Sequence, residues 1–237
     1  MQSIDRSRCE EGFVDLREYM SVRRAYNLVR QEADTSRRLT FEEFAILCRL
    51  DVADGPLKTS AIAEYQGALR PTMTHRTNHL AKLGFIDRGE GTVDRRNIVC
   101  EISEDGRAHV RKLAEETRGQ IPAGQPLART SAERVRKYVD AMGSVYCTAG
   151  ELVLLALYVE QDSPCTVTRL VELLGLLQPT VSMSVSSLID KGLVVREKGA
   201  DISARSSNIV LTSEGTAHAK SLADRITAII VRRRPRS

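Results

Sequence analysis

The sequence lacks the features that mark membrane, secreted and zinc-binding proteins. No run approaches the ~18 consecutive apolar residues that a membrane-spanning helix needs. The first residues, MQSIDRSRCEEGF, have no apolar core of the kind found in a signal peptide. The five cysteines are scattered and form no CxxC pair or Cys/His cluster with zinc spacing. We therefore expect a cytoplasmic protein with free thiols and neither a metal nor a cofactor.

Sequence motifs of the common enzyme classes are also missing. There is no HExxH, GxxxxGK[ST] or GxSxG motif, and no plausible Ser/His/Asp cluster. The GEG at Gly89 is not followed by a helix, so it indicates a turn rather than a nucleotide-binding loop. His75 and His79 have the spacing of a metal pair, but no acidic or thiol partner stands near them in the sequence. We expect no catalytic residues and no enzymatic activity.

Composition alone permits several functions. A hydrophobic content of 42% is enough to bury ordinary cores, and 237 residues correspond to one or two domains. The net charge of +4 and the pI near 8.9 are compatible with a polyanionic partner but do not demand one. The positions of the basic residues must therefore decide whether such a partner exists.

An internal repeat organises the chain. LTFEEFAILCRL, from Leu39, aligns with CTAGELVLLALY, from Cys147, at an offset of 108 residues. The same offset pairs Pro71 with Pro179, Leu80 with Leu188, Gly84 with Gly192 and Arg88 with Arg196, and after a one-residue insertion Arg96 pairs with Arg205 and Gly106 with Gly215. Two copies of one module follow from this pattern.

Each copy predicts the same order of elements. In the first copy, residues 40–52 have helical spacing with Thr40 as N-cap, and a short helix begins at Thr59 or Ser60. Residues 68–84 contain the next helix, with Pro71 in its first turn and Gly84 at its end. Residues 85–102 form two strands joined by a charged hairpin, and a helix follows at 107–117. The second copy predicts helices at 150–159, 166–174 and 179–191, a hairpin at 193–211 and a helix from residue 214.

This order is that of a winged helix-turn-helix module. We expect a mainly α fold with short β-hairpin wings, as two winged helix-turn-helix domains in tandem: residues 1–120, a Pro/Gly linker at 121–130, and residues 131–237. Two outer helices are expected to pack against another module. One carries Phe13, Leu16, Met20 and Leu28, and the other carries Val135, Tyr138, Val139, Met142 and Val145 on one face. The two modules can then form a pseudo-dimer within one chain.

The stretch LAKLGFIDRGEGTVDRRNIVCEISEDG resembles the MarR family, in which a recognition helix runs into Leu-x-x-x-Gly-Leu-Ile-x-Arg. A wing bearing Asp-x-Arg then precedes a strand ending in Leu-Thr-x-x-Gly; here Asp94 and Arg96 match the wing, and Ile102-Ser103 replaces Leu-Thr. The second copy keeps LTSEG from Leu211 but has Ser203 in place of the wing aspartate. The resemblance covers roughly residues 13–118 and 131–231, and it implies a tandem, single-chain transcriptional regulator.

A helix in the major groove needs short polar side chains on its exposed face, and an Arg on a wing tip can enter the minor groove. Asp94 is expected to orient such an Arg, although a solvated hairpin tip is the alternative. The expected DNA contacts are Arg70, Thr72, Thr74, His75, Arg76, Asn78, His79, Arg88, Asp94, Arg95 and Arg96 in the first copy, and Thr180, Ser182, Met183, Ser186, Arg196 and Arg205 in the second.

The expected function is therefore transcription regulation by sequence-specific binding to double-stranded DNA. The alternative is a winged-helix protein-interaction or adaptor module, in which the second domain does not contact DNA. That alternative gains weight in the second copy, because residues 70–96 carry six basic and three acidic side chains, a balance of +3, whereas residues 178–205 carry four and three, a balance of only +1. A small-molecule effector, redox sensing at Cys9 and pairing of chains into a further homodimer remain open.

Overall fold

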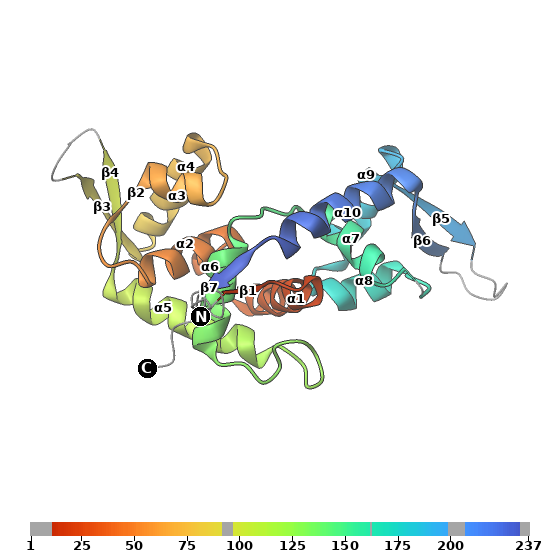
Figure 1. Cartoon of the computed structure of the whole chain (residues 1–237), viewed down its shortest axis with the longest axis horizontal. Coiled ribbons are helices and arrows are strands. Elements are labelled where there is room, and N and C mark those ends of the chain that lie inside the picture. Colours follow the sequence, from red (N-terminus) through yellow and green to blue (C-terminus); the bar gives the residue numbers. More distant parts are fainter. Residues whose placement is uncertain (1–10, 92–96, 162, 199–206, 233–237) are drawn as a thin grey trace, which may run out of the picture.

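A computed structural model describes residues 11–91, 97–161, 163–198 and 207–232 of the chain. Figure 1 shows an elongated molecule with one winged unit at each end of its long axis. The first unit consists of α2 (Phe41–Asp51), β2 (Leu57–Lys58), α3 (Thr59–Tyr65), α4 (Arg70–Lys82), β3 (Ile86–Glu90), β4 (Ile98–Ile102) and α5 (Glu104–Gly119). The second consists of α7 (Ala149–Val159), α8 (Val167–Leu174), α9 (Gln178–Asp190), β5 (Val194–Lys198), β6 (Ser207–Leu211) and α10 (Ser213–Thr227).

The remaining elements lie between the two units in Figure 1. They are β1 (Glu11–Phe13), α1 (Leu16–Glu32), the short 3-10 helix η2 (Thr35–Arg37), α6 (Ala132–Met142) and β7 (Ile230–Arg232). β1 pairs with β7 in an antiparallel sheet, with Phe13 opposite Ile230. Strands from the two ends of the described chain are therefore hydrogen-bonded to each other. None of the described helices is both long and apolar enough to cross a lipid bilayer.

The predicted repeat is confirmed in the local structure of the two units. Thr40 and Thr148 each cap a helix through a capping box, with Glu43 and Glu151 returning the hydrogen bond to the cap backbone. A proline stands in the first turn of both α4 and α9. The wing strands pair antiparallel in both units, and β2 adds a third strand beside β4 in the first. The predicted tandem winged-helix fold is thus confirmed.

The buried face of α1 differs from the predicted one. Tyr19, Val22, Tyr26 and Val29 are the buried residues at helical spacing, whereas Leu16 and Met20 are only half-buried. Phe13 lies outside the helix, in β1, and 68% of its surface is exposed. The prediction was wrong for Phe13, whereas Leu16 and Met20 do pack against the core; it missed the two tyrosines, which bury large apolar rings. The predicted apolar positions of α6 are confirmed as buried, and so is Val145, which follows the end of the helix.

One continuous hydrophobic cluster joins both winged units and the helices between them. Tyr19 of α1, Val139 of α6 and Ile226 of α10 are each fully buried in this cluster. The two modules therefore share one hydrophobic core and are not independent domains joined by a linker.

Polar contacts also fasten α1 to the second unit. Arg24 Nε donates to the Glu172 carbonyl at 2.7 Å and Asn27 Nδ2 donates to the Leu174 carbonyl at 2.9 Å. Gln31 donates to the carbonyl of Gly175. Gly175 has φ +58°, and a Cβ there would stand 2.7 Å from the Arg24 carbonyl oxygen. Side chains of α1 thus cap the last carbonyls of α8, which helps to set the orientation of the second helix-turn-helix.

Candidate nucleic-acid interface

The second helix of the first helix-turn-helix, α4, has one buried and one exposed face. Met73, Thr77 and Leu80 are fully buried, and the Thr77 hydroxyl donates to the Met73 carbonyl at 3.0 Å. The exposed face carries the predicted contact residues Arg70, Thr72, Thr74, His75 and Asn78. Because the apolar positions anchor the helix, its donors and acceptors are presented to solvent in a fixed order.

Two further predicted contact residues are half-buried and are held by the scaffold. His79 Nδ1 lies 2.7 Å from Glu43 Oε1, and the carboxylate of Glu43 also closes the capping box of α2. Arg88 of β3 donates through Nη1 to the side-chain oxygen of Asn78. These links connect α4 both to the helix beneath it and to the wing.

A hollow of about 250 Å³ lies between α3, α4 and the wing. It is lined by Thr59, Ser60, Arg70, Thr74, Arg88, Asn97 and Ile98. Two guanidinium groups beside several hydroxyl and amide groups suit one segment of a sugar-phosphate backbone. Thr59, Ser60 and Asn97 are not among the contacts predicted from the sequence. Thr59 and Ser60 could have been predicted as contacts, because the sequence places them at the start of a helix close to the wing.

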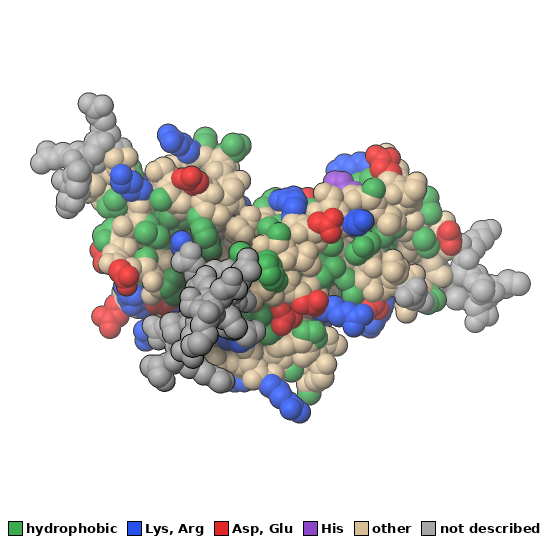
Figure 2. All heavy atoms as spheres, viewed as in Figure 1, with side chains coloured by type: hydrophobic (Ala, Val, Ile, Leu, Met, Phe, Trp, Pro, Cys, Tyr) green, Lys and Arg blue, Asp and Glu red, His purple; other side chains and the backbone are tan. Residues whose placement is uncertain are grey.

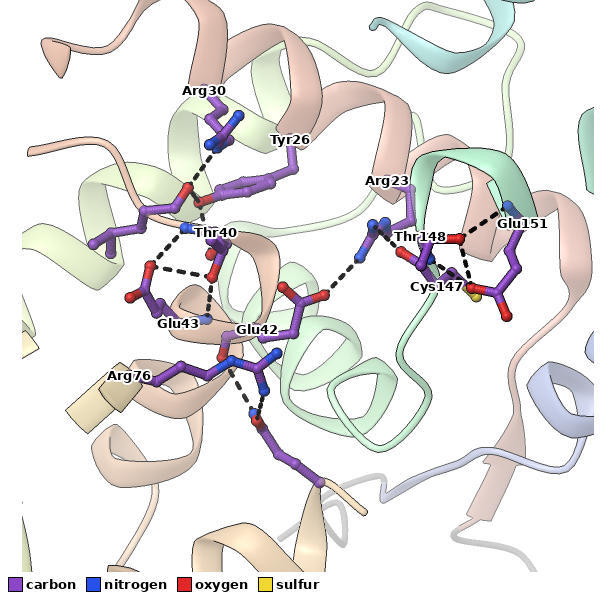
Figure 3. A network of polar contacts seen from close by, with 12 residues as sticks. Arg23, Tyr26, Arg30, Thr40, Glu42, Glu43, Arg76, Cys147, Thr148 and Glu151 are labelled. Atoms are coloured by element: carbon purple, nitrogen blue, oxygen red, sulfur yellow. Dashed lines mark hydrogen bonds and ion pairs between the residues drawn. The ribbon is translucent and has the colours of Figure 1, made fainter. Parts of the chain in front are cut away.

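Arg76, which was predicted to lie near phosphates, is half-buried and belongs to a polar network (Figure 3). Its Nη1 donates to Gln66 Oε1 at 3.5 Å, and Gln66 Nε2 donates to the Glu42 carbonyl at 3.2 Å. Arg23 forms an ion pair with the Glu42 carboxylate at 3.5 Å and donates to the Cys147 carbonyl at 3.3 Å. The network therefore runs from the recognition helix, through α2 and α1, to the start of α7.

The equivalent helix α9 has the same framework but a different surface. Val181, Val185 and Leu188 are buried, while Met183 and Ser186 are exposed. The predicted contacts Thr180 and Ser182 are half-buried, and Arg196 of β5 is exposed. No Lys, Arg or His occurs between Gln178 and Asp190, whereas α4 contains Arg70, His75, Arg76, His79 and Lys82. The two recognition helices thus differ in charge.

The predicted wing-tip contacts lie outside the described residues. Asp94, Arg95 and Arg96 fall in the first such segment, and Arg205 falls in the second. Figure 2 shows basic and acidic side chains interspersed on the face in view, without a continuous band of one sign. The candidate interface therefore rests on α4, α9 and the described parts of the wings.

Four cysteines lie in the described part of the chain, and all four are buried free thiols. Burial raises the pKa of Cys48 and Cys147 above the ordinary thiol value, and it raises the pKa of Cys165 to about 11. Raised thiol pKa values disfavour the reactive thiolate. Cys9, the predicted candidate for redox sensing, lies outside the described residues. In the described ranges, no three His, Cys, Asp or Glu side chains gather as a metal site would require.

Comparisons with known proteins address both repeats. MarR family models match residues 39–98 and residues 152–201. The chain is 31% identical over 88 residues to the "Uncharacterized HTH-type transcriptional regulator YfiV" of Bacillus subtilis (strain 168), covering 37% of this chain and 54% of that protein. The chain thus spans about half the length of this curated relative.

Solved structures of bacterial and archaeal regulators are similar to parts of the chain. The transcriptional regulator BldR of Sulfolobus solfataricus is 21% identical with a TM-score of 0.36, covering 42% of this chain and 67% of that one. Bordetella bronchiseptica BpsR is also 21% identical, with a TM-score of 0.35, covering 48% of this chain and 82% of its own. The family matches to both repeats, together with the paired winged units, show that this chain belongs to the MarR family and carries two copies of its module.

Proposed function

We propose that this protein is a transcriptional regulator that binds double-stranded DNA at specific sequences. The exposed face of α4 is the observation that carries the proposal. It combines Thr, His and Asn side chains that can hydrogen-bond to base edges with arginines at its margins. In this proposal α4 lies in the major groove, with Thr72, Thr74, His75 and Asn78 toward the bases. The hollow between Arg70 and Arg88 takes a phosphate.

The proposed wing contacts complete the interface. Arg95 or Arg96 enters the minor groove, and Asp94 orients the guanidinium before binding. In the second module, α9 and Arg196 face the duplex, with Arg205 on the equivalent wing. Membership of the family supports this arrangement, and the hydrogen bond from Arg88 to Asn78 favours it because it joins the wing to the recognition helix.

We further propose that the two modules act as a pseudo-dimer. The shared hydrophobic cluster, the pairing of β1 with β7 and the capping of α8 by α1 support a fixed relation between the two recognition helices. Two helices held in this way can contact half-sites about one DNA turn apart. The proposed domain boundaries remain residues 1–120 and 131–237, joined by the linker at 121–130.

Salt-dependent binding tests the proposal most broadly. A duplex selected from a random pool should bind the whole chain in fluorescence anisotropy, and log affinity should fall linearly with log salt. The expected slope is roughly −0.9 for each phosphate neutralised. Absence of binding to any selected duplex at low salt would contradict the proposal, and so would equal affinity for selected and scrambled duplexes.

We propose a cavity in the first module as the binding site of a small-molecule effector. A space of about 950 Å³ lies between the end of α1, η2 and α5, and its lining includes Tyr26, Arg37, Ala108, His109 and Lys112. A compound that raises the melting temperature of the whole chain should lose this effect in Ala108→Trp, which fills the cavity. The same variant should still bind DNA. An unchanged shift in Ala108→Trp would place the compound elsewhere.

A further inference from the structure

The exposed face of α9 carries one long apolar side chain, that of Met183. Its exposed fraction is 74%, whereas Met73 and Met142 are fully buried and Met20 is half-buried. Among the methionines of the described ranges, only Met183 therefore presents most of its apolar surface to solvent. A single exposed apolar side chain is ordinary on a protein surface, but Met183 lies on the face of α9 that is equivalent to the exposed face of α4.

The rest of this face restricts what the partner can be. Between Gln178 and Asp190 the exposed and half-exposed polar side chains are mostly hydroxyls, and none is a cation. The face therefore has no arginine or lysine for the bidentate contact to guanine that is most common in the major groove. Lys191, the residue that follows α9 and lines the same hollow as Met183, is a cation available for a phosphate, so α9 itself offers the bases mainly hydroxyl groups and the apolar Met183.

One group on a base pair matches such a face. The 5-methyl group of thymine is the apolar feature of the major groove, and apolar side chains commonly distinguish thymine by contact with it. Met183 occupies the repeat position of His75, 108 residues earlier, on the exposed face of α4. Its unbranched thioether can adapt to a methyl group. We propose that the second module recognises thymine methyl groups through Met183. This inference rests on the proposed DNA-binding function.

The two half-sites of the operator should therefore differ in chemistry. The half bound by α4 is recognised by hydrogen bonds to base edges, and the half bound by α9 is recognised by contact with methyl groups. Burial of one methyl group contributes about a fourfold change in affinity. The second half-site should accordingly contain T·A pairs at one or two positions.

Replacement of thymine by deoxyuridine removes only the methyl group and tests this directly. In the selected duplex, each thymine is replaced singly by deoxyuridine, and affinity is measured for the wild-type chain by anisotropy. The half-site of α4 is assigned as the one in which Asn78→Ala relaxes sequence preference. We expect roughly fourfold weaker binding for one or two replacements in the other half-site.

Met183→Ser is the matched variant, because serine occupies neighbouring exposed positions of α9 and the substitution removes no buried group. It should bind the parent duplex more weakly and should tolerate deoxyuridine at the sensitive positions without further loss. An unchanged melting temperature confirms that its fold is intact. 5-Methylcytosine paired with guanine at a sensitive position should retain more affinity than unmethylated cytosine does for the wild-type chain, but not for Met183→Ser.

The outcomes separate the two proposals. If no selected duplex binds, the regulator function itself is rejected. If the duplex binds but deoxyuridine has no effect outside the α4 half-site, or has the same effect on Met183→Ser as on the wild type, recognition of methyl groups by Met183 is rejected. If DNase I footprinting of the whole chain on the selected duplex shows protection of only the α4 half-site, recognition by Met183 is rejected and a protein-interaction role for the second module is favoured.

Discussion

The two recognition helices share a framework and differ in what they expose. Buried positions 108 residues apart carry Met73 and Val181, Thr77 and Val185, and Leu80 and Leu188. Gly84 and Gly192, which follow the two helices, have similar positive φ values of 76° and 71°. The exposed positions instead change from His75 and Asn78 to Met183 and Ser186. The buried positions and the left-handed glycine that follows each helix are thus shared by both copies, while the exposed residues differ.

A second difference lies in the helices that pack against α4 and α9, namely α2 and α7. Phe41 and Glu42 begin α2, whereas Ala149 and Gly150 begin α7. Glu42 forms the ion pair with Arg23 and is part of the network that reaches α4. Beside α9 the smaller residues line a hollow of about 590 Å³. The recognition helix of the first module is therefore held by a polar network at a place where the second module has open space.

The largest expected effect concerns the core that both modules share. Val139→Asp places a carboxylate at a fully buried position, and it should lower the free energy of unfolding by at least about 4 kcal/mol. Chemical denaturation of the whole chain measures this loss. Val195→Asp, at a position with 42% exposure, is the control and should cost less than about 1 kcal/mol. A small loss at Val139 would mean that the modules do not depend on a common core.

The glycines that follow the two wings test whether the modules have the same structural constraints. A Cβ at Gly106 would overlap the Phe85 carbonyl oxygen, and one at Gly215 would overlap the Leu193 carbonyl oxygen. Gly106→Ala and Gly215→Ala should each destabilise the protein by about 2–3 kcal/mol. Gly119, at the end of α5, has no atom within 4 Å of an added Cβ, so Gly119→Ala should not destabilise. If chemical denaturation shows clearly different losses of unfolding free energy for Gly106→Ala and Gly215→Ala, the two positions are not structurally equivalent.

A smaller effect is expected from His109, which is half-buried, whereas its repeat equivalent in the second module, His218, is exposed. Its ring stacks on Phe85 at 4.2 Å, and burial, with Arg37 and Lys112 nearby, lowers the pKa of His109 to about 4. Because the unfolded chain binds a proton near pH 6.5, stability should fall as the pH drops from about 6.5 to 4. Partial exposure reduces the contribution of this residue to about 1–2 kcal/mol.

The control for that pH dependence is His109→Gln. Denaturation of the wild type and of this variant at pH 7 and at pH 4.5 isolates the contribution of His109. The variant should lose less stability than the wild type over this interval. An equal loss in both proteins would assign the pH dependence to other groups.

Much of this architecture could be predicted because the sequence contains each helix and wing in two copies, so a signal found in one copy could be checked in the other. The capping residues Thr40 and Thr148 and the prolines of the recognition helices are local signals, so the helix starts agree with the structure. The pairing of β1 with β7 could not be predicted, since a three-residue strand has no periodicity and its partner lies at the other end of the chain. The contact between His79 and Glu43 likewise depends on how α4 packs on α2.

The smallest expected difference lies between the two wings. Arg96→Ala should weaken DNA binding more than Arg205→Ala does, because Asp94 stands two residues before Arg96 whereas Ser203 takes that place before Arg205. We expect a difference of a few-fold in affinity, on the order of 1 kcal/mol or less. Anisotropy titrations of both variants on one duplex at one salt concentration measure it. Equal losses would show that the wings contribute alike.

In our proposal α4 is the principal element that recognises DNA sequence, and substitutions at two equivalent positions of α4 and α9 examine this role. Asn78→Ala and the equivalent Ser186→Ala are titrated against the selected duplex and against duplexes with single base-pair changes in each half-site. Asn78→Ala should weaken binding by about tenfold and should relax preference in one half-site only, since a good base-edge contact contributes ~1–3 kcal/mol. Ser186→Ala should change affinity by less than about threefold, which is below that range. An Asn78→Ala variant with wild-type affinity and unchanged preference, or a larger loss in Ser186→Ala, would contradict the account.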